Sequence, residues 1–404
     1  MKIGIITNLY PPLIKGGAEI VAAMQAEGLK EALHHVFVIT SKPYNYLGQK
    51  SLQLKEEVDD ISVYRFFPGN IYYYLRAYKF PGFIRFLWHL LDIFNLWSYY
   101  FTKKILIEEK PDIIITHNLM GLGFLIPKLL KKLKIRHLHI VHDVQLITPS
   151  GLIIKGQENS WQNTFFKKIG YVKLMRSLLA NPEIVISPSK FLINYYVQHK
   201  FFKKSKKYVL PNPLKSLIQF EREGNKYLNI LYLGQLYKAK GILDLIKVFK
   251  ELKLNNAYLH IVGTGKEQEK ALELAGDNKK IIFYGWQTGK KLLSVLAGID
   301  ILVVPSLCYE NSPTVIYEAL SMGIPVLTSR IGGAGELIVE GKNGWTFPPG
   351  RFDILKKKLY NLYKQREKLP ALANNCRRSV AGFITSYYIN NLLDIIDEEQ
   401  RKTF

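Results

Sequence analysis

Two glutamates, Glu310 and Glu318, are the residues whose type and spacing point most directly to chemistry. They follow one another in the pattern Glu-x7-Glu and flank the predicted start of a helix. Ser312 is suited to cap this helix, because its hydroxyl can accept a hydrogen bond from an unpaired backbone N–H. Pro313 is suited to be the first helical residue, because its fixed φ matches the helix. The two carboxylates are therefore expected on either side of a helix N-terminus.

The mouth of this helix is suited to an anion such as a diphosphate. Its first backbone N–H groups, near Thr314 and Val315, lie at the positive end of the helix dipole. The flanking carboxylates cannot favour a phosphate, so we expect them to accept hydrogen bonds from hydroxyl groups of sugars attached to it. The plainer alternative is that Glu310 is a solvated loop residue and Glu318 a surface helix residue.

Two apolar strands position this helix. The first strand is predicted at Ile301–Val304, and the second at Val326–Ser329. Between them the helix should end at Gly323, because a glycine followed closely by Pro325 is a typical helix stop. The whole stretch is a strand–loop–helix–strand unit.

This unit resembles the signature of the retaining glycosyltransferases of family 4, also called glycosyltransferase group 1. The resemblance is carried by ENSPTVIYEA from Glu310, by GIPVLTS from Gly323, and by the pairs Gly332-Gly333 and Asn343-Gly344. It implies the GT-B fold, an α/β architecture of two Rossmann-like domains facing a cleft, with a C-terminal helix that crosses back to the first domain. It also implies a donor sugar held by Glu310 and ribose hydroxyls held by Glu318.

A second glycine-rich loop lies near the N-terminus. The apolar run Lys2–Thr7 predicts a strand, and Lys15–Glu19 opens a helix that extends to about Leu33. Such a loop offers backbone N–H groups to a phosphate or sugar. In the family that the chain resembles, this loop faces the donor pyrophosphate and the acceptor, so Gly16 and Gly17 are expected to bind substrate.

Histidines follow two further predicted strands. His117 and Asn118 come after one strand, and His142 and Asp143 come after the next. Ligands bind at the carboxyl ends of parallel strands, so we expect these residues at a site. Zinc is disfavoured, because no third ligand stands at a suitable spacing.

The segment from His142 to Pro149 resembles the acceptor-side loop of the family. The resemblance assigns His142 to the donor sugar near its reacting carbon, and His117 and Asn118 to a supporting or acceptor-contact role. The alternative for each histidine is a buried ring that is satisfied by a backbone carbonyl.

The second half begins with a strand at Asn229–Leu233 and a loop that ends at Lys240-Gly241. Family members carry an arginine and a lysine on the donor diphosphate here. Lys240 matches the lysine, but Gln235 replaces the arginine, and an amide forgoes the stronger, charge-assisted hydrogen bond. Whether Lys238 compensates stays open. Gly263 and Gly265 resemble the nucleotide-facing loops of the family.

Length and charge set the wider frame. The chain has 404 residues, 48% of them hydrophobic, and a formal net charge of +23. We expect a soluble protein with an acceptor-binding domain at 1–215, a nucleotide-sugar-binding domain at 216–380 and a C-terminal helix at 381–404. Residues Gln219–Lys226 should form the linker. No nucleic-acid motif accompanies the charge, so an anionic membrane surface is the expected partner, and no nucleic acid.

The stretch from Arg65 to Ile107 is aromatic and basic. The segment Phe83–Leu106 has helical spacing but is too charged to span a bilayer. Its apolar stripe is more typical of a core than of a membrane surface, and for the loop Tyr72–Arg85 neither interpretation is favoured. With two cysteines and no recognisable signal peptide, the sequence predicts a cytoplasmic protein, peripheral at the inner face of the membrane.

Together these features predict a glycosyltransferase with His142, Lys240 and Glu310 as catalytic residues. Its donor would be a nucleotide sugar of the UDP or GDP type, and its acceptor a glycan or lipid-linked molecule of surface polysaccharide biosynthesis. No D-x-D motif is present, so neither metal nor cofactor is expected. Two alternatives stay open: a UDP-sugar 2-epimerase of the same architecture, and a non-catalytic basic adaptor at the membrane.

Overall fold

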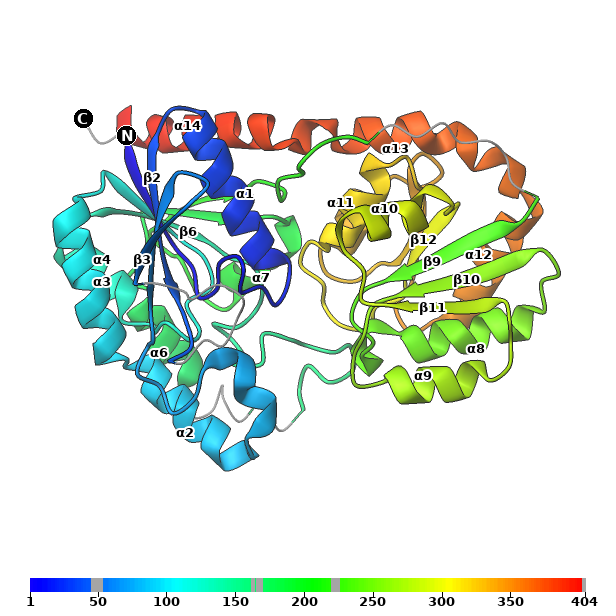
Figure 1. Ribbon diagram of the computed structural model, residues 1–404, viewed down its shortest axis with the longest axis horizontal. Helices are drawn as coiled ribbons and strands as arrows, with labels where there is room; N and C mark the ends of the chain where they lie inside the picture. The colour runs from blue at the N-terminus through cyan, green and yellow to red at the C-terminus, as the bar shows by residue number, and fades with distance from the viewer. Residues whose placement is uncertain (45–53, 161–163, 165–169, 219–225, 402–404) are drawn as a thin grey trace. The chain divides into compact units, whose positions relative to one another are not determined.

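The computed structural model describes residues 1–44, 54–160, 164, 170–218 and 226–401 (Figure 1). The chain divides into two compact units. Unit 1 contains Met1–Gly151, Trp161–Pro213 and Thr385–Phe404, and unit 2 contains Leu152–Ser160 and Leu214–Ile384. The predicted linker lies outside the described residues, apart from Lys226.

In the described part of unit 1, a sheet with the strand order β3-β4-β2-β1-β5-β6-β7-β8 forms the centre. Only β3 and β4 pair in antiparallel fashion; the other neighbours are parallel. The strands are β1 (Lys2–Ile6), β2 (His35–Ser41), β3 (Lys55–Val58), β4 (Ile61–Phe66), β5 (Ile113–Thr116), β6 (Arg136–Ile140), β7 (Ile184–Ser187) and β8 (Lys206–Val209).

Helices α1 and α14 lie on one face of this sheet (Figure 1). Leu29 of α1 and Leu392 of α14 are completely buried in one core with strand residues such as Val38. The C-terminal helix therefore packs on the first domain, as predicted, although it begins at Thr385 rather than at residue 381. The helices of unit 1 are α1 (Gly17–Glu31), η1 (Tyr74–Lys79), α2 (Gly82–Ile93), α3 (Leu96–Glu109), α4 (Ile126–Lys132), α6 (Tyr171–Leu178), α7 (Lys190–Gln198) and α14 (Thr385–Arg401).

Unit 2 contains a fully parallel sheet with the order β11-β10-β9-β12-β13-β14 in its described part. Helices α8, α9 and α12 pack on one face, and α10, α11 and α13 on the other. The strands are β9 (Leu228–Leu233), β10 (Ala257–Val262), β11 (Ile281–Gly285), β12 (Ile301–Val304), β13 (Val326–Ser329) and β14 (Gly344–Phe347).

The helices of unit 2 are α8 (Ile242–Leu252), α9 (Gln268–Ala275), α10 (Gly289–Ala297), α11 (Thr314–Ser321), α12 (Phe352–Lys364) and α13 (Ala373–Val380), with the short turns η2 (Lys238–Lys240), η3 (Ala334–Leu337), η4 (Arg366–Lys368), η5 (Pro370–Leu372) and η6 (Ala381–Phe383). Each unit thus has a mainly parallel sheet covered by helices, which confirms the predicted pair of Rossmann-like domains.

One segment of the first half belongs to unit 2, contrary to the predicted boundary at residue 215. In Leu152–Ser160, Ile154 forms a β-bridge with Cys308, and the Ile153 carbonyl accepts a hydrogen bond from the Tyr309 backbone N at 2.9 Å. These contacts are made by backbone groups, which every residue carries. The pattern of side chains in the sequence therefore does not predict these contacts.

The predicted helix Phe83–Leu106 is two helices, α2 and α3. The break has a local cause, because Asn95 caps α3 and accepts a hydrogen bond from the Ser98 backbone N at 2.8 Å. The spacing of apolar residues continues across the break, which is why it predicts a single helix.

The apolar stripe of α2 lies on the surface, so its interpretation as core is wrong. Phe83 is 68% exposed, Leu87 49%, Leu90 44% and Phe94 51%. On the other side of the helix Trp88 is buried. Periodicity shows that a helix has an apolar face but does not show what covers it. Among the described residues, no helix has the length and apolarity needed to cross a membrane.

Candidate active site

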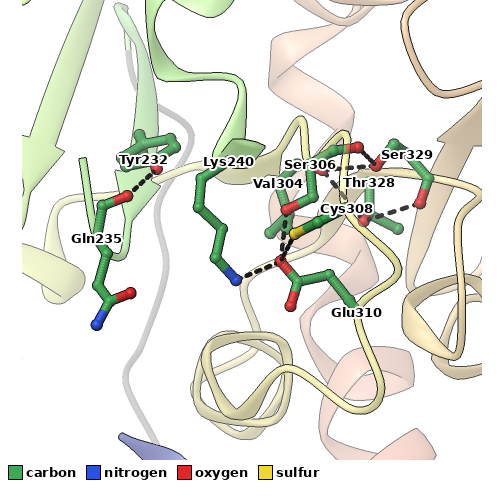
Figure 2. A network of polar contacts seen from close by, with 9 residues as sticks. All are labelled: Tyr232, Gln235, Lys240, Val304, Ser306, Cys308, Glu310, Thr328 and Ser329. Carbon is green, nitrogen blue, oxygen red and sulfur yellow. Dashed lines mark hydrogen bonds and ion pairs between the residues drawn. The ribbon is translucent and has the colours of Figure 1, made fainter. Parts of the chain in front are cut away.

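Lys240 and Glu310 form an ion pair in unit 2 (Figure 2). Lys240 ends η2, and Glu310 lies in the loop after β12, where Lys240 Nζ is 2.6 Å from Glu310 Oε1. The Ser306 hydroxyl donates to the same oxygen at 2.6 Å, and the Cys308 thiol lies 3.6 Å from it. Figure 2 shows the second carboxylate oxygen pointing away from these donors. That oxygen can accept a hydrogen bond from a ligand.

The surroundings keep both members of the pair charged. Burial alone would raise the pKa of Glu310, but the charge of Lys240 and the hydrogen bonds from Lys240 and Ser306 hold it below its ordinary value. Burial would likewise lower the pKa of Lys240, and the Glu310 charge raises it instead. Burial, reinforced by Glu310, raises the pKa of Cys308 to about 12, so this thiol is not activated.

Backbone contacts fix the loop that carries Glu310. Gly332 has a φ of +60°, and a Cβ atom there would lie 2.0 Å from the Glu310 carbonyl oxygen. The Gly333 backbone N donates to this oxygen at 2.8 Å. The Ser329 hydroxyl also donates to the Ser306 carbonyl at 2.7 Å. Gly332 of the motif therefore has a structural cause, since only glycine allows this approach.

Helix α11 begins one residue later than predicted. Pro313, with an extended ψ of 118°, occupies the N-cap position, and no side chain caps the helix. The Ser312 hydroxyl lies 2.5 Å from the Tyr317 hydroxyl instead. Thr314 and Val315 are therefore the first two helical residues, and their N–H groups have no acceptor within the helix. The predicted cap is thus absent, and the binding of an anion at this helix mouth stays a prediction.

Glu318 lies one turn further into α11. Burial raises its pKa above the ordinary value, and no opposing charge or hydrogen bond lowers it. Among the described residues its carboxylate has no side-chain partner. A half-buried carboxylate without a partner is unfavourable in a free protein, because burial removes water without replacing its hydrogen bonds.

The loop after β9 carries Gln235 and Lys238, and both side chains are exposed. The Gln235 carbonyl accepts a hydrogen bond from the Tyr232 hydroxyl at 2.8 Å. Figure 2 shows the Gln235 amide extending in the same direction as the Lys240 ammonium group. A contact of this amide with the ligand of Lys240 stays a prediction.

Gly263 and Gly265 permit two loops of unit 2 to pack together. A Cβ atom at Gly263, where φ is +134°, would lie 1.9 Å from the Gly234 carbonyl oxygen, and one at Gly265 would lie 2.5 Å from that of Leu236. Packing alone therefore explains both glycines. Their contact with a nucleotide stays a prediction.

In unit 1, four side chains form a row from the half-buried His142 to the C-terminal helix, and the other three are buried. His142 Nε2 lies 2.8 Å from His117 Nδ1, and His117 Nε2 lies 2.9 Å from Gln25 Oε1. Gln25 Nε2 donates to the Tyr388 hydroxyl of α14 at 3.0 Å. His117 is completely buried, which excludes its predicted contact with an acceptor and leaves the supporting role.

The hydrogen bonds of this row fix which ring nitrogen of each histidine carries a proton. Burial lowers the pKa of His142 to about 4, and burial, His142 and His139 lower that of His117 well below its ordinary value. Both rings are therefore neutral. Because Gln25 Oε1 accepts, His117 Nε2 carries the proton, and His117 Nδ1 accepts from His142 Nε2. The row thus sets the tautomer of His142.

The other two histidines of β6 do not form a metal site. His137 and His139 both contact the Thr116 hydroxyl, at 2.7 and 2.8 Å. Within the described residues, no group of three histidines, cysteines or acids could hold a metal ion. These histidines are core residues that share the Thr116 hydroxyl as a hydrogen-bond partner.

Asn118 and Asp143, at the ends of β5 and β6, are joined by Gln145. The Gln145 amide donates to Asn118 Oδ1 at 2.7 Å, and the Gln145 backbone N donates to Asp143 Oδ1 at 2.8 Å. Burial raises the pKa of Asp143 to about 6, although the Gln145 hydrogen bonds oppose this effect. The structure thus brings these two predicted residues together.

The glycine-rich loop of unit 1 differs from its expected form. Glu19 Oε2 accepts a hydrogen bond from the Gly16 backbone N at 2.8 Å, so this N–H is not free for a phosphate. Gly17 is the first residue of α1, and its N–H lies at the helix N-terminus. Of the two predicted glycines, Gly17 keeps an N–H suited to an anion.

Sequence reasoning missed three residues of this site: Ser306, Gln25 and Tyr388. Ser306 could have been found, because it lies two residues after the end of a predicted strand, close to the carboxyl end as the two histidines are. Gln25 could have been noticed as a polar residue in an apolar helix face. Tyr388 could not, because nothing in the sequence places α14 beside Gln25.

Two parallel α/β domains with a returning C-terminal helix define the class of GT-B proteins. Within that class, the chain belongs to the group 1, or family 4, glycosyltransferases. The family description "Glycosyltransferase Family 4" matches residues 15–215, and "Glycosyl transferases group 1" matches residues 215–379.

A relative matches along most of the chain, and solved structures share its fold. An uncharacterized 42.6 kDa protein in the cps region of Klebsiella pneumoniae is 27% identical over 340 residues, 83% of this chain and 87% of that protein. A sucrose-phosphate synthase of Thermosynechococcus elongatus has a TM-score of 0.75 at 17% identity, covering 98% of each chain. Alr3699/HepE of Anabaena, solved with UDP-glucose, has a TM-score of 0.71 at 16% identity, covering 98% of this chain and 100% of that chain.

Proposed function

We propose that this protein is a retaining glycosyltransferase that moves a sugar from a nucleotide sugar of the UDP or GDP type to a hydroxyl of a lipid-linked or membrane-proximal glycan. It acts without metal or cofactor, at the inner face of the membrane, in surface polysaccharide biosynthesis. The Klebsiella relative, named for its cps region, supports the pathway. The Anabaena neighbour, solved with UDP-glucose, supports the donor class.

The unpartnered carboxylate of Glu318 carries this proposal. A structural glutamate at this depth would normally have a partner, whereas Glu318 has only the desolvation that raises its pKa. Two ribose hydroxyls supply the missing donors. Because Glu318 lies one turn inside α11, the diphosphate attached to that ribose then reaches the helix mouth at Thr314.

The other residues act on the sugar and on the leaving diphosphate. The free oxygen of Glu310 accepts a hydroxyl of the donor sugar, and His142 contacts the sugar near its reacting carbon. The bond from this carbon to the diphosphate breaks, the acceptor oxygen bonds to the carbon on the same face, and the proton of the acceptor hydroxyl passes to the leaving diphosphate oxygen. Lys240 is already balanced by Glu310, so the N–H groups and dipole of α11 supply much of the stabilisation of the leaving group.

The test is thermal stabilisation by UDP, GDP and their glucose conjugates, with and without EDTA. One diphosphate should stabilise the wild type, by about 2.7 kcal/mol at a hundred times its dissociation constant, and EDTA should not change this. Glu318→Ala should remove most of the shift, while the exposed control Glu269→Ala should keep it.

Three outcomes would overturn parts of the proposal. No shift with any nucleotide would support the adaptor alternative. Release of UDP together with an unsaturated sugar, without an acceptor, would identify an epimerase. A shift that disappears with EDTA would contradict metal-independent binding.

A further inference from the structure

Unit 1 contains a pocket of about 250 Å³ at the carboxyl ends of its central strands. Asn8 follows β1, Asn118 follows β5 and Asp143 follows β6, and all three line the pocket. The side opposite these strand ends is aromatic and basic. Its lining residues from η1, α2 and the chain before η1 are Tyr72, Tyr74, Ala77, Arg85, Trp88 and His89.

The strand side of the pocket is suited to a sugar. Gln145 is 6% exposed and lines the pocket, and its side-chain oxygen has no hydrogen-bond partner among the described residues. The Asp143 carboxylate lies beside it and accepts only from Gln145 in the hydrogen bonds of this region. A hydroxyl-rich ligand provides the donors that both groups lack.

The opposite side carries two positive charges. Lys15 Nζ lies 2.9 Å from the Tyr74 hydroxyl and 4.2 Å from the centre of its ring. Neither Lys15 nor Arg85 forms an ion pair with a described residue. His89 adds no charge at neutral pH, because burial and the Arg85 charge lower its pKa to about 4. The Lys15 ammonium and the Arg85 guanidinium thus give this side of the pocket two cations that suit a diphosphate.

A rigid aromatic wall joins this basic side to helix α2. Trp88 stacks on Tyr72 with 5.4 Å between ring centres and on Tyr74 with 6.0 Å. The Trp88 indole N–H also donates to the Tyr72 carbonyl at 2.7 Å. The inner face of α2 is therefore anchored to the pocket wall, and Arg85 keeps its place on the rim.

The outer face of α2 is apolar and lies on the surface. Its exposed side chains are Phe83, Phe86, Leu87, Leu90 and Phe94. Between Arg65 and Ile107 the only acidic residue is Asp92, and its carboxylate is buried, accepting from the Asn70 amide at 2.9 Å and the Gly121 backbone N at 2.8 Å. An apolar helix face without exposed acids suits the interface of an anionic membrane.

We propose that this pocket binds an acceptor in which a sugar is joined through a diphosphate to a long-chain lipid. The sugar lies against Asp143 and Gln145, Lys15 and Arg85 hold the diphosphate, and the lipid chain lies at the outer face of α2 within the membrane interface. This assignment rests on the proposed function and names its acceptor. Helix α2 thus has the sugar and diphosphate on its inner side and the lipid chain on its outer side.

The first test uses undecyl diphosphate as the probe, measured by calorimetry with the whole chain. Wild type should bind it, and Arg85→Gln should bind at least tenfold more weakly. Lys128→Gln removes an exposed charge from α4, far along the sequence, and should bind as wild type does. Undecyl maltoside, which lacks the diphosphate, should not distinguish wild type from Arg85→Gln. Equal binding of undecyl diphosphate by wild type and Arg85→Gln would overturn the proposal.

The second test is flotation with vesicles of phosphatidylcholine and phosphatidylglycerol. Leu87→Glu should reduce the bound fraction at least tenfold, whereas Leu272→Glu, at a similarly exposed position of α9 in unit 2, should leave it unchanged. Equal flotation of the two variants would overturn the role of α2. Thermal denaturation checks that both variants are folded.

Nucleotide binding separates this inference from the proposed function. The acceptor variants should keep the stabilisation by the nucleotide, because their residues lie in unit 1 and Glu318 lies in unit 2. If wild type binds a nucleotide but no undecyl diphosphate, the acceptor assignment falls and the transferase stands. If wild type binds no nucleotide, the proposed function itself falls.

Discussion

At the scale of single residues, Gln235 stands where the family carries an arginine. Its amide extends in the same direction as the Lys240 ammonium group in Figure 2, and we expect a guanidinium at this position to contact the same diphosphate. Gln235→Arg should tighten the binding of the cognate nucleoside diphosphate about tenfold, because a charge-assisted hydrogen bond is roughly twice as strong as a neutral one. Calorimetry at low and high salt checks this, and the gain should shrink at high salt.

A variant of Lys238 tests whether this residue takes the place of the missing arginine. If Lys238 compensates for the missing arginine, Lys238→Gln should weaken nucleotide binding and Gln235→Arg should restore it in the double variant. If Lys238→Gln binds as tightly as wild type, the chain works with a single cation, Lys240, at its diphosphate site.

The Lys240–Glu310 pair makes stability depend on pH. The pKa of Glu310 is lowered in the folded protein, so its charge stabilises the fold above the unfolded pKa, near 4.5, and this contribution is lost as pH falls through the lower folded value. Glu310→Gln should therefore reduce the free energy of unfolding by about 2 kcal/mol at pH 7, because it leaves the half-buried Lys240 without its partner.

Urea denaturation tests this pH dependence. The difference between wild type and Glu310→Gln should narrow steadily in acid, below the ordinary pKa of a glutamate. A difference that is as large in acid as at pH 7 would show that packing of the side chain, rather than its charge, accounts for the effect.

At the scale of elements, the row from His142 to Tyr388 ties helices α1 and α14 to the ends of two strands, β5 and β6. Gln25→Leu removes the acceptor for His117 and so frees the tautomer of both histidines. The turnover number should fall about tenfold, equivalent to a loss of about 1.4 kcal/mol, while KM for the donor changes little. Tyr388→Phe should have a smaller effect, because it only orients the Gln25 amide.

A control separates positioning from general destabilisation. Gln25→Glu places a carboxylate beside His117, which should raise the pKa of that ring and make activity depend on pH near neutrality. If the row were purely structural, the protein would be less stable in all three variants, but its activity would show no new dependence on pH.

Element boundaries show what local signals can and cannot reveal. Ser189 caps α7, its hydroxyl accepting from the Leu192 backbone N at 3.2 Å, as the Ser-Pro-Ser signal predicts. Ser312 fails as a cap, because the proline after it is extended and the hydroxyl meets Tyr317. Strand ends were the better guide, since they correctly grouped Asn118 with Asp143 and His117 with His142.

At the scale of the whole molecule, α14 is part of the core of unit 1 rather than an appendage. Tyr388, Ile389, Leu392 and Ile396 are all at most 2% exposed. Burying each such side chain contributes about 1.5–3 kcal/mol, and four of them together rival the stability of a typical domain. A chain that ends at Ile384 should therefore lose the folded state of unit 1.

Denaturation followed by two spectroscopic signals, one from each unit, checks this. Unit 2 should keep a cooperative transition and its nucleotide-dependent shift in the truncated chain, while unit 1 should lose its own transition. A truncated protein in which both transitions persist would contradict the role of α14 in the core.

The fold was predictable from alternation of strands and helices, and the family from one short signature. The surface was less predictable, because the stripe of α2 has the periodicity of a core helix yet faces solvent at Phe83. The attachment of Leu152–Ser160 to unit 2 was also beyond reach, because it depends on backbone hydrogen bonds. Site residues on strand ends could be found, and those that act through distant helices could not.

Unit 1 is built from segments that are separated in the sequence, and this has a consequence for synthesis on the ribosome. Its last core helix emerges only after the whole of Leu214–Ile384 has been made, which takes roughly 10 to 30 s at usual rates of translation. During that time the face that α14 will cover is bare, and Leu152–Ser160 has not yet met the loop at Cys308. The nascent chain thus exposes apolar surface at both places, so a chaperone that acts during translation should raise the yield of folded protein more than one added afterwards.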